Sequence, residues 1–453
     1  MQSTTRRRAP RPRPLRLAVG AVTLGLAVVL TPVISSGSVP QAAAQGSSNA
    51  PDHSAFYVPP AELPAESGTV IRSQPMNLFP SVPDLAGGGA LPADAQRIMY
   101  RSTGSTGDPI AVTGTYMQPK MPWTGPGPRP LAIVTPGTQG QGDQCAPSKT
   151  MEVGLRLQTT PPSMGAGYTM LDAVSMLEQG FAVVVPDYEG LGTPGHHAYL
   201  SRESAGRTSL DAARAAFRLP GTDLEPNSPA VATGYSQGGG AAGAVGELHP
   251  TYAPDINLVG IVAGAPPSDM FATLDHIDGG LITGAVGYAI NGIIRSHPHL
   301  APVFDAHLND AGRRMLATTA GQCIPDTILS YGMHRTSEFT LDGRSLADVA
   351  RSEPEIAAVI ESYNLGDSAP AVPSMVLIGR NDDVIPYDTA VDLTRSWCDQ
   401  GVPVQLHTAE FPSLAPGFVL DHGIPMVAGR TVGAQYLKDR VLGLPAPSSC
   451  GTV

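Results

Sequence analysis

The chain carries little positive charge and few cysteines, and each shortage excludes a class of function. Its 28 Lys and Arg residues are outnumbered by 39 Asp and Glu residues, which gives a formal net charge of −11. Nucleic-acid binding depends on neutralising phosphate charges, so we expect no nucleic-acid partner for this acidic chain. The 4 cysteines are too far apart in sequence for any two to form a zinc-ligand pair. With 42% hydrophobic and 15% charged residues, the composition is that of a globular protein.

The first 44 residues differ from the rest of the chain. They contain six arginines and no acidic residue, and an apolar stretch runs from Leu17 to Ile34, ahead of three alanines that end at Ala44. This pattern predicts a signal peptide over residues 1–44, cleaved near Ala44, and a secreted protein without stable membrane insertion. Loss of the six arginines would change the formal net charge from −11 to −17. An uncleaved membrane anchor is the alternative, although two glycines and a proline interrupt the apolar stretch.

The cysteines all follow this segment. They are Cys145, Cys323, Cys398 and Cys450. An even number of cysteines in an exported chain predicts disulfides, here two, for which three connectivities are possible.

The rest of the chain alternates short apolar runs with helical patterns. Residues 45–90 are rich in Pro, Ala, Ser and Gly, and we predict an extended surface segment there. Residues 97–103 and 110–119 have the pattern of a β-hairpin. Six apolar runs of strand length follow, at 131–137, 181–187, 230–236, 257–265, 374–380 and 404–411. Runs of this kind suit the buried strands of a parallel sheet, and the helical pattern at 204–219 lies between two of them. The chain is therefore predicted to be α/β, with a mostly parallel sheet covered by helices on both faces.

One interval breaks this alternation. Between the core segments 91–265 and 373–453, residues 266–372 have helical signals and little strand pattern. We predict that they form a helical cap inserted into the sheet domain. The apolar stretch 281–294 is too short at 14 residues to cross a membrane. It is interpreted as a buried cap helix, with a lipid-facing lid as the alternative.

A candidate nucleophile stands directly after the apolar run at 230–236. Gly234-Tyr235-Ser236-Gln237-Gly238 matches G-x-S-x-G, and a plausible helix follows it. In α/β-hydrolases this motif forms a sharp strand-to-helix turn that exposes the serine hydroxyl, and the glycines avoid collisions with neighbouring elements. A chance Gly-Ser-Gly loop is the alternative. The strand before the motif and the helix after it favour Ser236 as a nucleophile.

A serine nucleophile needs a base, and the base needs an acid to orient it. In this fold the acid and then the histidine follow the serine in sequence, each in a loop after a later strand. Asp382 stands just after the run 374–380 and is preferred to its neighbour Asp383. His422 lies after the last strand and before a predicted helix at 424–440, whereas the rival His407 lies inside the strand. The pairs His196–His197 and His297–His299 lack further ligands at suitable spacing, so we expect no metal.

Acyl transfer also needs donors for the oxyanion. The backbone N–H of Gln237, directly after the serine, is one candidate, and Thr138 in the glycine-rich loop after the run 131–137 is the other. That loop has neither the lysine of a P-loop nor the G-x-G-x-x-G spacing of a dinucleotide site, so we expect no phosphate-bearing or other cofactor.

From about residue 70 to the C-terminus the sequence resembles the secretory lipase family typified by lipase A, in an actinobacterial form. The motifs that carry the resemblance are GTQGQGDQCAPS (137–148), PDYEG (186–190), GYSQGG (234–239), HPHLAPVFDAHLNDAG (297–312), GQCIP (321–325), NDDVIPY (381–387), WCDQG (397–401) and the DHG around His422. The resemblance implies an α/β-hydrolase fold with a helical cap and a triad of Ser236, Asp382 and His422. It also implies the disulfides Cys145–Cys323 and Cys398–Cys450.

Together these observations predict a secreted serine lipase or esterase that acts on carboxylic esters such as triacylglycerols, in some cases at a lipid–water interface. A carboxylesterase for short or unusual acyl groups is the first alternative. A serine peptidase or amidase uses the same triad, and a catalytically inactive binding protein of this fold is a further alternative.

Overall fold

The computed structural model describes residues 48–50, 53–79 and 93–453. The predicted signal peptide lies outside the described residues. Among the described helices, none has the length and apolar character needed to cross a membrane.

A nine-stranded sheet organises the chain. The strands, in spatial order, are β1 (Val70–Met76), β2 (Ala93–Thr103), β3 (Pro109–Pro119), β7 (Ala182–Pro186), β4 (Leu131–Thr135), β8 (Ala230–Tyr235), β9 (Leu258–Gly264), β10 (Ser374–Gly379) and β11 (Val404–Ala409). β1 to β3 are antiparallel, and β3 also pairs antiparallel with β7. From β7 to β11 all pairings are parallel. These six parallel strands are the six apolar runs predicted from the sequence, and β2 and β3 form the predicted hairpin.

Two regions contain secondary structure that the sequence pattern did not predict. Within residues 45–90, expected to wander over the surface, β1 pairs with β2, and a 3-10 helix η1 (Ser54–Tyr57) buries Phe56 and Tyr57. β1 lies at the sheet edge and is only partly buried, so it lacks the continuous apolar run of the central strands. A separate hairpin of β5 (Leu155–Thr159) and β6 (Pro162–Ala166) is likewise only partly buried.

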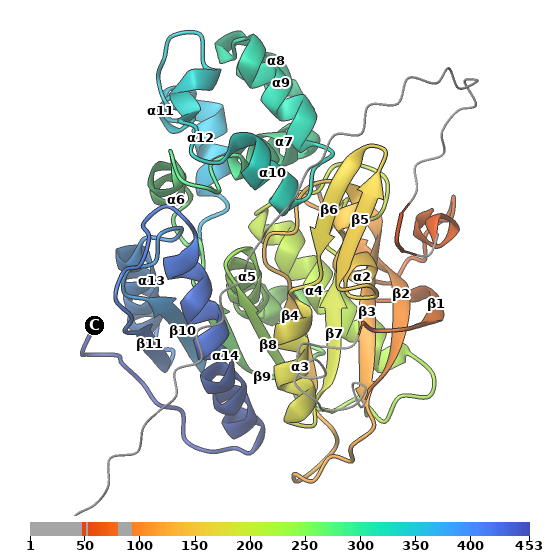
Figure 1. Ribbon diagram of the computed structural model, residues 1–453. Coiled ribbons are helices and arrows are strands. Elements are labelled where there is room, and N and C mark those ends of the chain that lie inside the picture. The colour runs from red at the N-terminus through yellow and green to blue at the C-terminus, as the bar shows by residue number, and fades with distance from the viewer. Residues whose placement is uncertain (1–47, 51–52, 80–92) are drawn as a thin grey trace, which may run out of the picture. The chain divides into compact units, whose positions relative to one another are not determined.

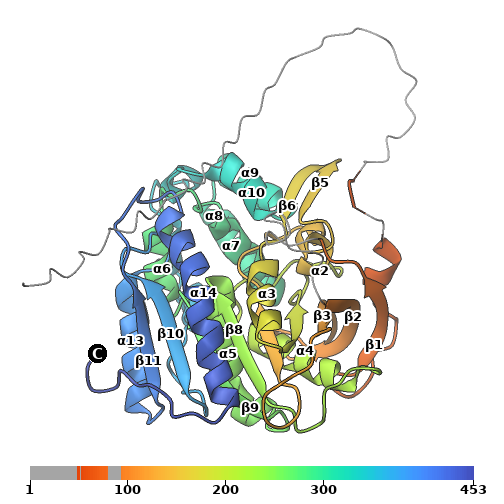
Figure 2. The same cartoon turned by 60° about the horizontal axis from the view of Figure 1, so that its bottom comes forward.

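Helices cover both faces of the sheet. α3 (Met170–Glu178) and α14 (Leu420–Val441) lie on one face, and α4 (Arg202–Arg218) and α5 (Gln237–Tyr252) lie on the other (Figures 1 and 2). α13 (Tyr387–Asp399) packs against β10 and β11. α4 is the helix predicted at 204–219, and it begins two residues earlier because the Ser201 hydroxyl accepts the Ser204 N–H as an N-cap.

The connection between β9 and β10 consists of helices. It contains α6 (Met270–Ile277), α7 (Ala285–Ser296), η3 (Pro298–Leu300), α8 (Ala301–His307), α9 (Asp310–Thr319), α10 (Ile324–Tyr331), η4 (Thr336–Phe339), α11 (Leu346–Ser352) and α12 (Pro354–Glu361). Figure 1 shows α7 to α12 gathered at one end of the strands. We refer to residues 266–372 as the crossover helices. Eight of the twelve residues of α7 are buried, as expected of a buried helix.

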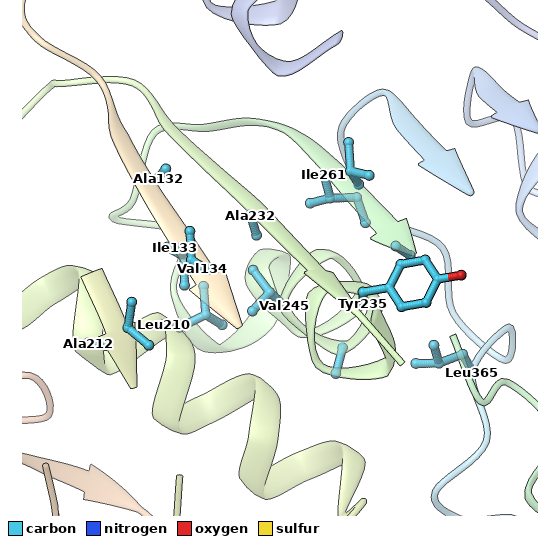
Figure 3. Packing of buried hydrophobic residues seen from close by; sticks show 14 of the residues in the cluster. Ala132, Ile133, Val134, Leu210, Ala212, Ala232, Tyr235, Val245, Ile261 and Leu365 are labelled. Carbon is cyan, nitrogen blue, oxygen red and sulfur yellow. The ribbon is translucent and has the colours of Figure 1, made fainter. Parts of the chain in front are cut away.

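The sheet core explains why this arrangement is stable. Every residue of β4, β7 and β10 is buried, so these strands have apolar side chains on both faces. Figure 3 shows Ile133 and Val134 of β4 beside Leu210 of α4, with Val245 of α5 close to β8. Burying a side chain of this size stabilises the fold by about 1.5–3 kcal/mol, so the packed strands give the site rigid support.

Two disulfides join distant segments, in the pairing that the resemblance implied. Cys145, in the 3-10 helix η2 (Asp143–Cys145), is bonded to Cys323 at the start of α10. Cys398 of α13 is bonded to Cys450 near the C-terminus.

Candidate active site

Ser236 occupies a strained turn between β8 and α5. Its φ of 61° lies in the left-handed region, where a residue with a side chain is uncommon. A Cβ at Gly234 would stand 2.4 Å from the Thr135 carbonyl oxygen, and one at Gly238 would stand 2.1 Å from the same atom. The two glycines of the motif are therefore required by the close approach of β4, as the sequence argument expected. The turn places Ser236 at the N-terminus of α5.

The predicted acid and base contact each other directly. His422 Nδ1 lies 2.8 Å from Asp382 Oδ2 and 2.9 Å from Oδ1, and both side chains are buried. Asp382 Oδ1 also accepts the backbone N–H groups of Val384, at 3.0 Å, and Ile385, at 2.8 Å. These bonds fix the orientation of the carboxylate toward the imidazole.

Asp383, the neighbour of Asp382, caps the start of α14. Its two carboxylate oxygens accept the backbone N–H groups of Val419, at 2.8 Å, and His422, at 2.9 Å. These are N–H groups at the start of α14, where a helix has no internal acceptors. The sequence predicted that this helix begins at 424. The long-range capping by Asp383 explains why α14 begins earlier, at Leu420. His422 is consequently in the first turn of the helix rather than before it.

Tyr235 connects the serine turn to the acid–base pair. Its ring centroid lies 4.9 Å from that of His422, and its hydroxyl donates to Asp382 Oδ2 at 3.4 Å. His276 of α6 contacts the same segment, with Nε2 3.1 Å from the Asp382 carbonyl oxygen. The rival histidine, His407, lies within β11 opposite Leu377.

A mostly apolar cavity opens onto Ser236. Thr138, Gln237, Val384 and Ile385 line it beside the serine. The crossover helices supply most of the remaining wall, with Met270, Leu274, Ile277, Val286, Ile290, Ile293, Phe304, Leu346, Ala350 and Ile360. The serine therefore lies where a long apolar group can be taken out of water.

The two predicted oxyanion donors lie at this cavity. Gln237 is the first residue of α5, and Thr138 belongs to the loop between β4 and η2. Within the described part of the chain, neither backbone N–H donates a hydrogen bond to the protein. Both N–H groups are thus available to a ligand.

A buried histidine that sequence reasoning missed holds the Gln237 side chain. His197 Nδ1 lies 3.0 Å from the Glu189 carbonyl oxygen, which only accepts, so Nδ1 carries the proton. His197 Nε2 then accepts from the Gln237 amide at 2.9 Å. Burial lowers the pKa of His197 to about 4, which keeps the ring neutral. This network occupies both ring nitrogens of His197.

The second histidine pair, His297 and His299, has a partner for one of its two rings. The rings of His297 and His299 lie 6.0 Å apart, and His299 pairs with Glu355. The described residues contain no group of three or more His, Cys, Asp or Glu side chains able to hold a metal ion.

The chain is similar to known lipases in sequence and in fold. A sequence model of secretory lipases matches residues 152–449. The secreted triacylglycerol lipase LIP3 of Malassezia globosa is 29% identical over 408 residues, covering 88% of this chain and 83% of the relative. A Mycobacterium tuberculosis protein named as a probable inactive lipase, MT1628, is 30% identical over 401 residues, covering 87% and 83%. The closed state of Candida antarctica lipase A has the same fold, with a TM-score of 0.71, 23% identity and coverage of 88% and 87%. Because the family match spans more than half of the sequence, this chain belongs to the secretory lipase family.

Proposed function

We propose that this protein is a secreted serine lipase that hydrolyses carboxylic esters, triacylglycerols among them, through an acyl-enzyme on Ser236. The observations that carry the proposal are the apolar cavity that opens onto Ser236 and the hydrogen-bonded pair of Asp382 and His422, whose imidazole packs against Tyr235, the residue before the serine. Export agrees with the N-terminal sequence pattern and with secreted relatives such as LIP3 of Malassezia globosa.

In the proposed mechanism His422 takes the proton of Ser236 while the serine Oγ attacks the ester carbonyl carbon. The N–H groups of Gln237 and Thr138 stabilise the resulting oxyanion. When the carbon–oxygen bond breaks, His422 returns the proton to the leaving alcohol. Water then attacks the acyl-enzyme with the same base and releases the fatty acid. Asp382 holds the imidazole in the correct tautomer and stabilises its protonated form.

The cavity favours long acyl chains over short ones. Its wall beyond Thr138 and Gln237 consists chiefly of Leu, Ile, Val, Met and Phe side chains of the crossover helices. Each methylene group removed from water stabilises binding by about 0.8 kcal/mol, so a wall of this kind rewards chain length. A carboxylesterase for short acyl groups would gain little from it.

One set of measurements tests both parts of the proposal. The enzyme that begins after Ala44 is assayed on p-nitrophenyl esters from acetyl to oleoyl and on emulsified triacylglycerol. We expect kcat/KM to rise with chain length, labelling of Ser236 by a fluorophosphonate, and loss of at least about 10³-fold in kcat for Ser236→Ala. Ser268→Ala is the matched control, because it removes a buried serine whose hydroxyl donates to the Thr389 carbonyl.

The contrary outcomes point to specific alternatives. Activity confined to acetyl and butyryl esters would identify a carboxylesterase rather than a lipase. A folded wild-type protein with neither turnover nor labelling would favour an inactive binding protein, the alternative that the name of the Mycobacterium tuberculosis relative raises.

A further inference from the structure

The loop that carries Thr138 is held by side chains at its start and by backbone hydrogen bonds to the crossover helices further along. It runs from the end of β4 at Thr135 to the start of η2 at Asp143. Three consecutive carbonyl oxygens in it each accept a hydrogen bond from a side chain. The Tyr188 hydroxyl donates to the Pro136 oxygen at 3.0 Å, the Gln139 amide to the Gly137 oxygen at 3.1 Å, and the Tyr168 hydroxyl to the Thr138 oxygen at 2.5 Å.

Fixing a carbonyl also fixes the N–H of the next residue. In a planar trans peptide, the C=O of one residue and the N–H of the following residue point in opposite directions. The hydrogen bond from Gln139 to the Gly137 oxygen therefore determines the direction of the Thr138 N–H. Thr138 lines the same cavity as Ser236, and its N–H has no acceptor within the described residues.

Gln139 is itself firmly held. Its side-chain nitrogen donates to Gly137 and also to the Thr169 hydroxyl, at 3.2 Å, so both amide protons are used. Gln139 is only 4% exposed. Glycine at position 137 has no side chain to restrict the peptide plane, so the Gln139 amide is the contact that sets the direction of this carbonyl.

The flanking tyrosines support the same interpretation. Burial raises the pKa of Tyr168 and of Tyr188 well above the usual value, so both hydroxyls remain donors. Tyr188 holds its position with a φ of 73°, a strained conformation for a bulky residue. Strain of this kind persists only where the surrounding structure over-determines it, and it concentrates at functional sites.

We infer that Gln139 is a positioning residue that aims the Thr138 N–H at the oxyanion, with Tyr188 and Tyr168 fixing the carbonyls on either side. The inference rests on the proposed function, since an oxyanion forms only if Ser236 attacks an ester.

Gln139→Met tests the inference, because methionine keeps a long unbranched side chain but donates no hydrogen bond. Per fluorophosphonate-titrated site, we expect kcat to fall by roughly 10- to 100-fold and KM to stay within about twofold. This is less than the 10²- to 10³-fold cost of deleting an oxyanion donor outright. A trifluoromethyl ketone, which forms a tetrahedral adduct on the serine, should lose affinity by the same factor as kcat/KM.

Gln141→Met is the matched control. Gln141 lies in the same loop and is 1% exposed, but its amide donates to the carbonyls of His197 and Tyr288, outside the loop. We expect this variant to lower the melting temperature while kcat per titrated site stays within about twofold. An unchanged kcat in Gln139→Met, or an equal fall in both variants, would overturn the inference.

Two further outcomes keep the test decisive. If Gln139→Met does not accumulate as folded protein, Tyr168→Phe takes its place, since it removes one hydroxyl and keeps the ring. We then expect kcat to fall about fivefold at constant KM, the equivalent of one hydrogen bond, and an unchanged kcat would overturn the inference. Failure of the proposed function looks different, because the wild-type enzyme would then show neither labelling nor turnover.

Discussion

At the scale of single residues, His197 makes the free energy of unfolding depend on pH. Its pKa is lowered from 6.5 to about 4 by burial, so between these values the unfolded chain binds a proton that the folded protein does not. The stabilising effect of the neutral ring is complete above pH 6.5 and is lost as pH falls toward 4. We expect the free energy of unfolding to decrease by about 2–3 kcal/mol from this residue between pH 7.5 and pH 4.5.

His197→Gln, which does not titrate, isolates this contribution in urea unfolding experiments. The stability of the variant has to be subtracted from that of wild type at each pH, because other groups titrate as well. Burial raises the pKa of Asp172 to about 6, for example, and this group makes the fold more stable as pH falls. The stability of wild type relative to the variant should decline as pH falls. His196→Gln, which changes the exposed neighbour, is the control for replacing a histidine in this segment. Parallel curves for wild type and His197→Gln would contradict the prediction.

Single residues also show which parts of the site the sequence predicts. The sequence predicts Ser236, Asp382 and His422 because each follows a strand whose apolar run is visible in the sequence, and the expected fold fixes their order. Asp383 and Gln139 were not assigned their places, because their partners are backbone groups: Val419 and His422 for the first, Gly137 for the second. A local sequence pattern cannot indicate that a side chain will form a hydrogen bond with a backbone carbonyl or N–H group that tertiary packing brings close to it.

At the scale of elements, the start of α5 depends on how closely it approaches the sheet. A Cβ at Gly239 would lie 1.9 Å from the Gly264 carbonyl oxygen of β9, so Gly239→Ala must displace backbone. A Cβ at Gly240 would meet only Pro267 Cγ and Cδ at 3.3 Å. We expect Gly239→Ala to cost more than about 3 kcal/mol, and Gly240→Ala to be neutral or stabilising by up to about 1 kcal/mol. Thermal unfolding of the two variants checks this, and equal melting temperatures would contradict it.

The same scale separates predictable elements from the others. The six parallel strands were predictable because burial on both faces leaves continuous apolar runs, as in β4 and β7. β1 was missed because an edge strand needs only partial burial, and the start of α14 was misplaced because Asp383 caps it from another segment.

At the scale of the whole molecule, the site is built by two parts of the chain that are distant in sequence. Ser236 and Asp382 follow the strands β8 and β10, His422 lies in the first turn of α14, and the crossover helices supply most of the apolar wall. The break in strand rhythm at 266–372 indicated an insertion, but the cavity itself was not predictable. Its wall combines α6, α7, α8, α11 and α12, whose mutual packing is set by contacts between elements rather than by periodicity within one.

The two disulfides should therefore differ in their effects on catalysis. Cys145–Cys323 closes 178 residues and lies beside backbone hydrogen bonds between Gln139 and Ile324 and between Gln141 and Gln322, which join the Thr138 loop to the crossover helices. Cys398–Cys450 closes 52 residues and holds the C-terminal tail, in which Ser449 donates to Val404 of the edge strand β11. On the chain-entropy relation their removal costs about 5 and about 4 kcal/mol respectively.

Replacing each pair by alanine separates stability from activity. Both double variants should unfold at lower urea concentration, by similar amounts. We expect Cys145→Ala/Cys323→Ala also to lower kcat per titrated site by about tenfold, because the Thr138 loop loses its covalent support and a misplaced oxyanion donor is costly. Cys398→Ala/Cys450→Ala should keep kcat within about twofold, because the tail it releases lies at the sheet edge. An equal loss of kcat in both variants would show that the first disulfide has no particular link to the oxyanion loop.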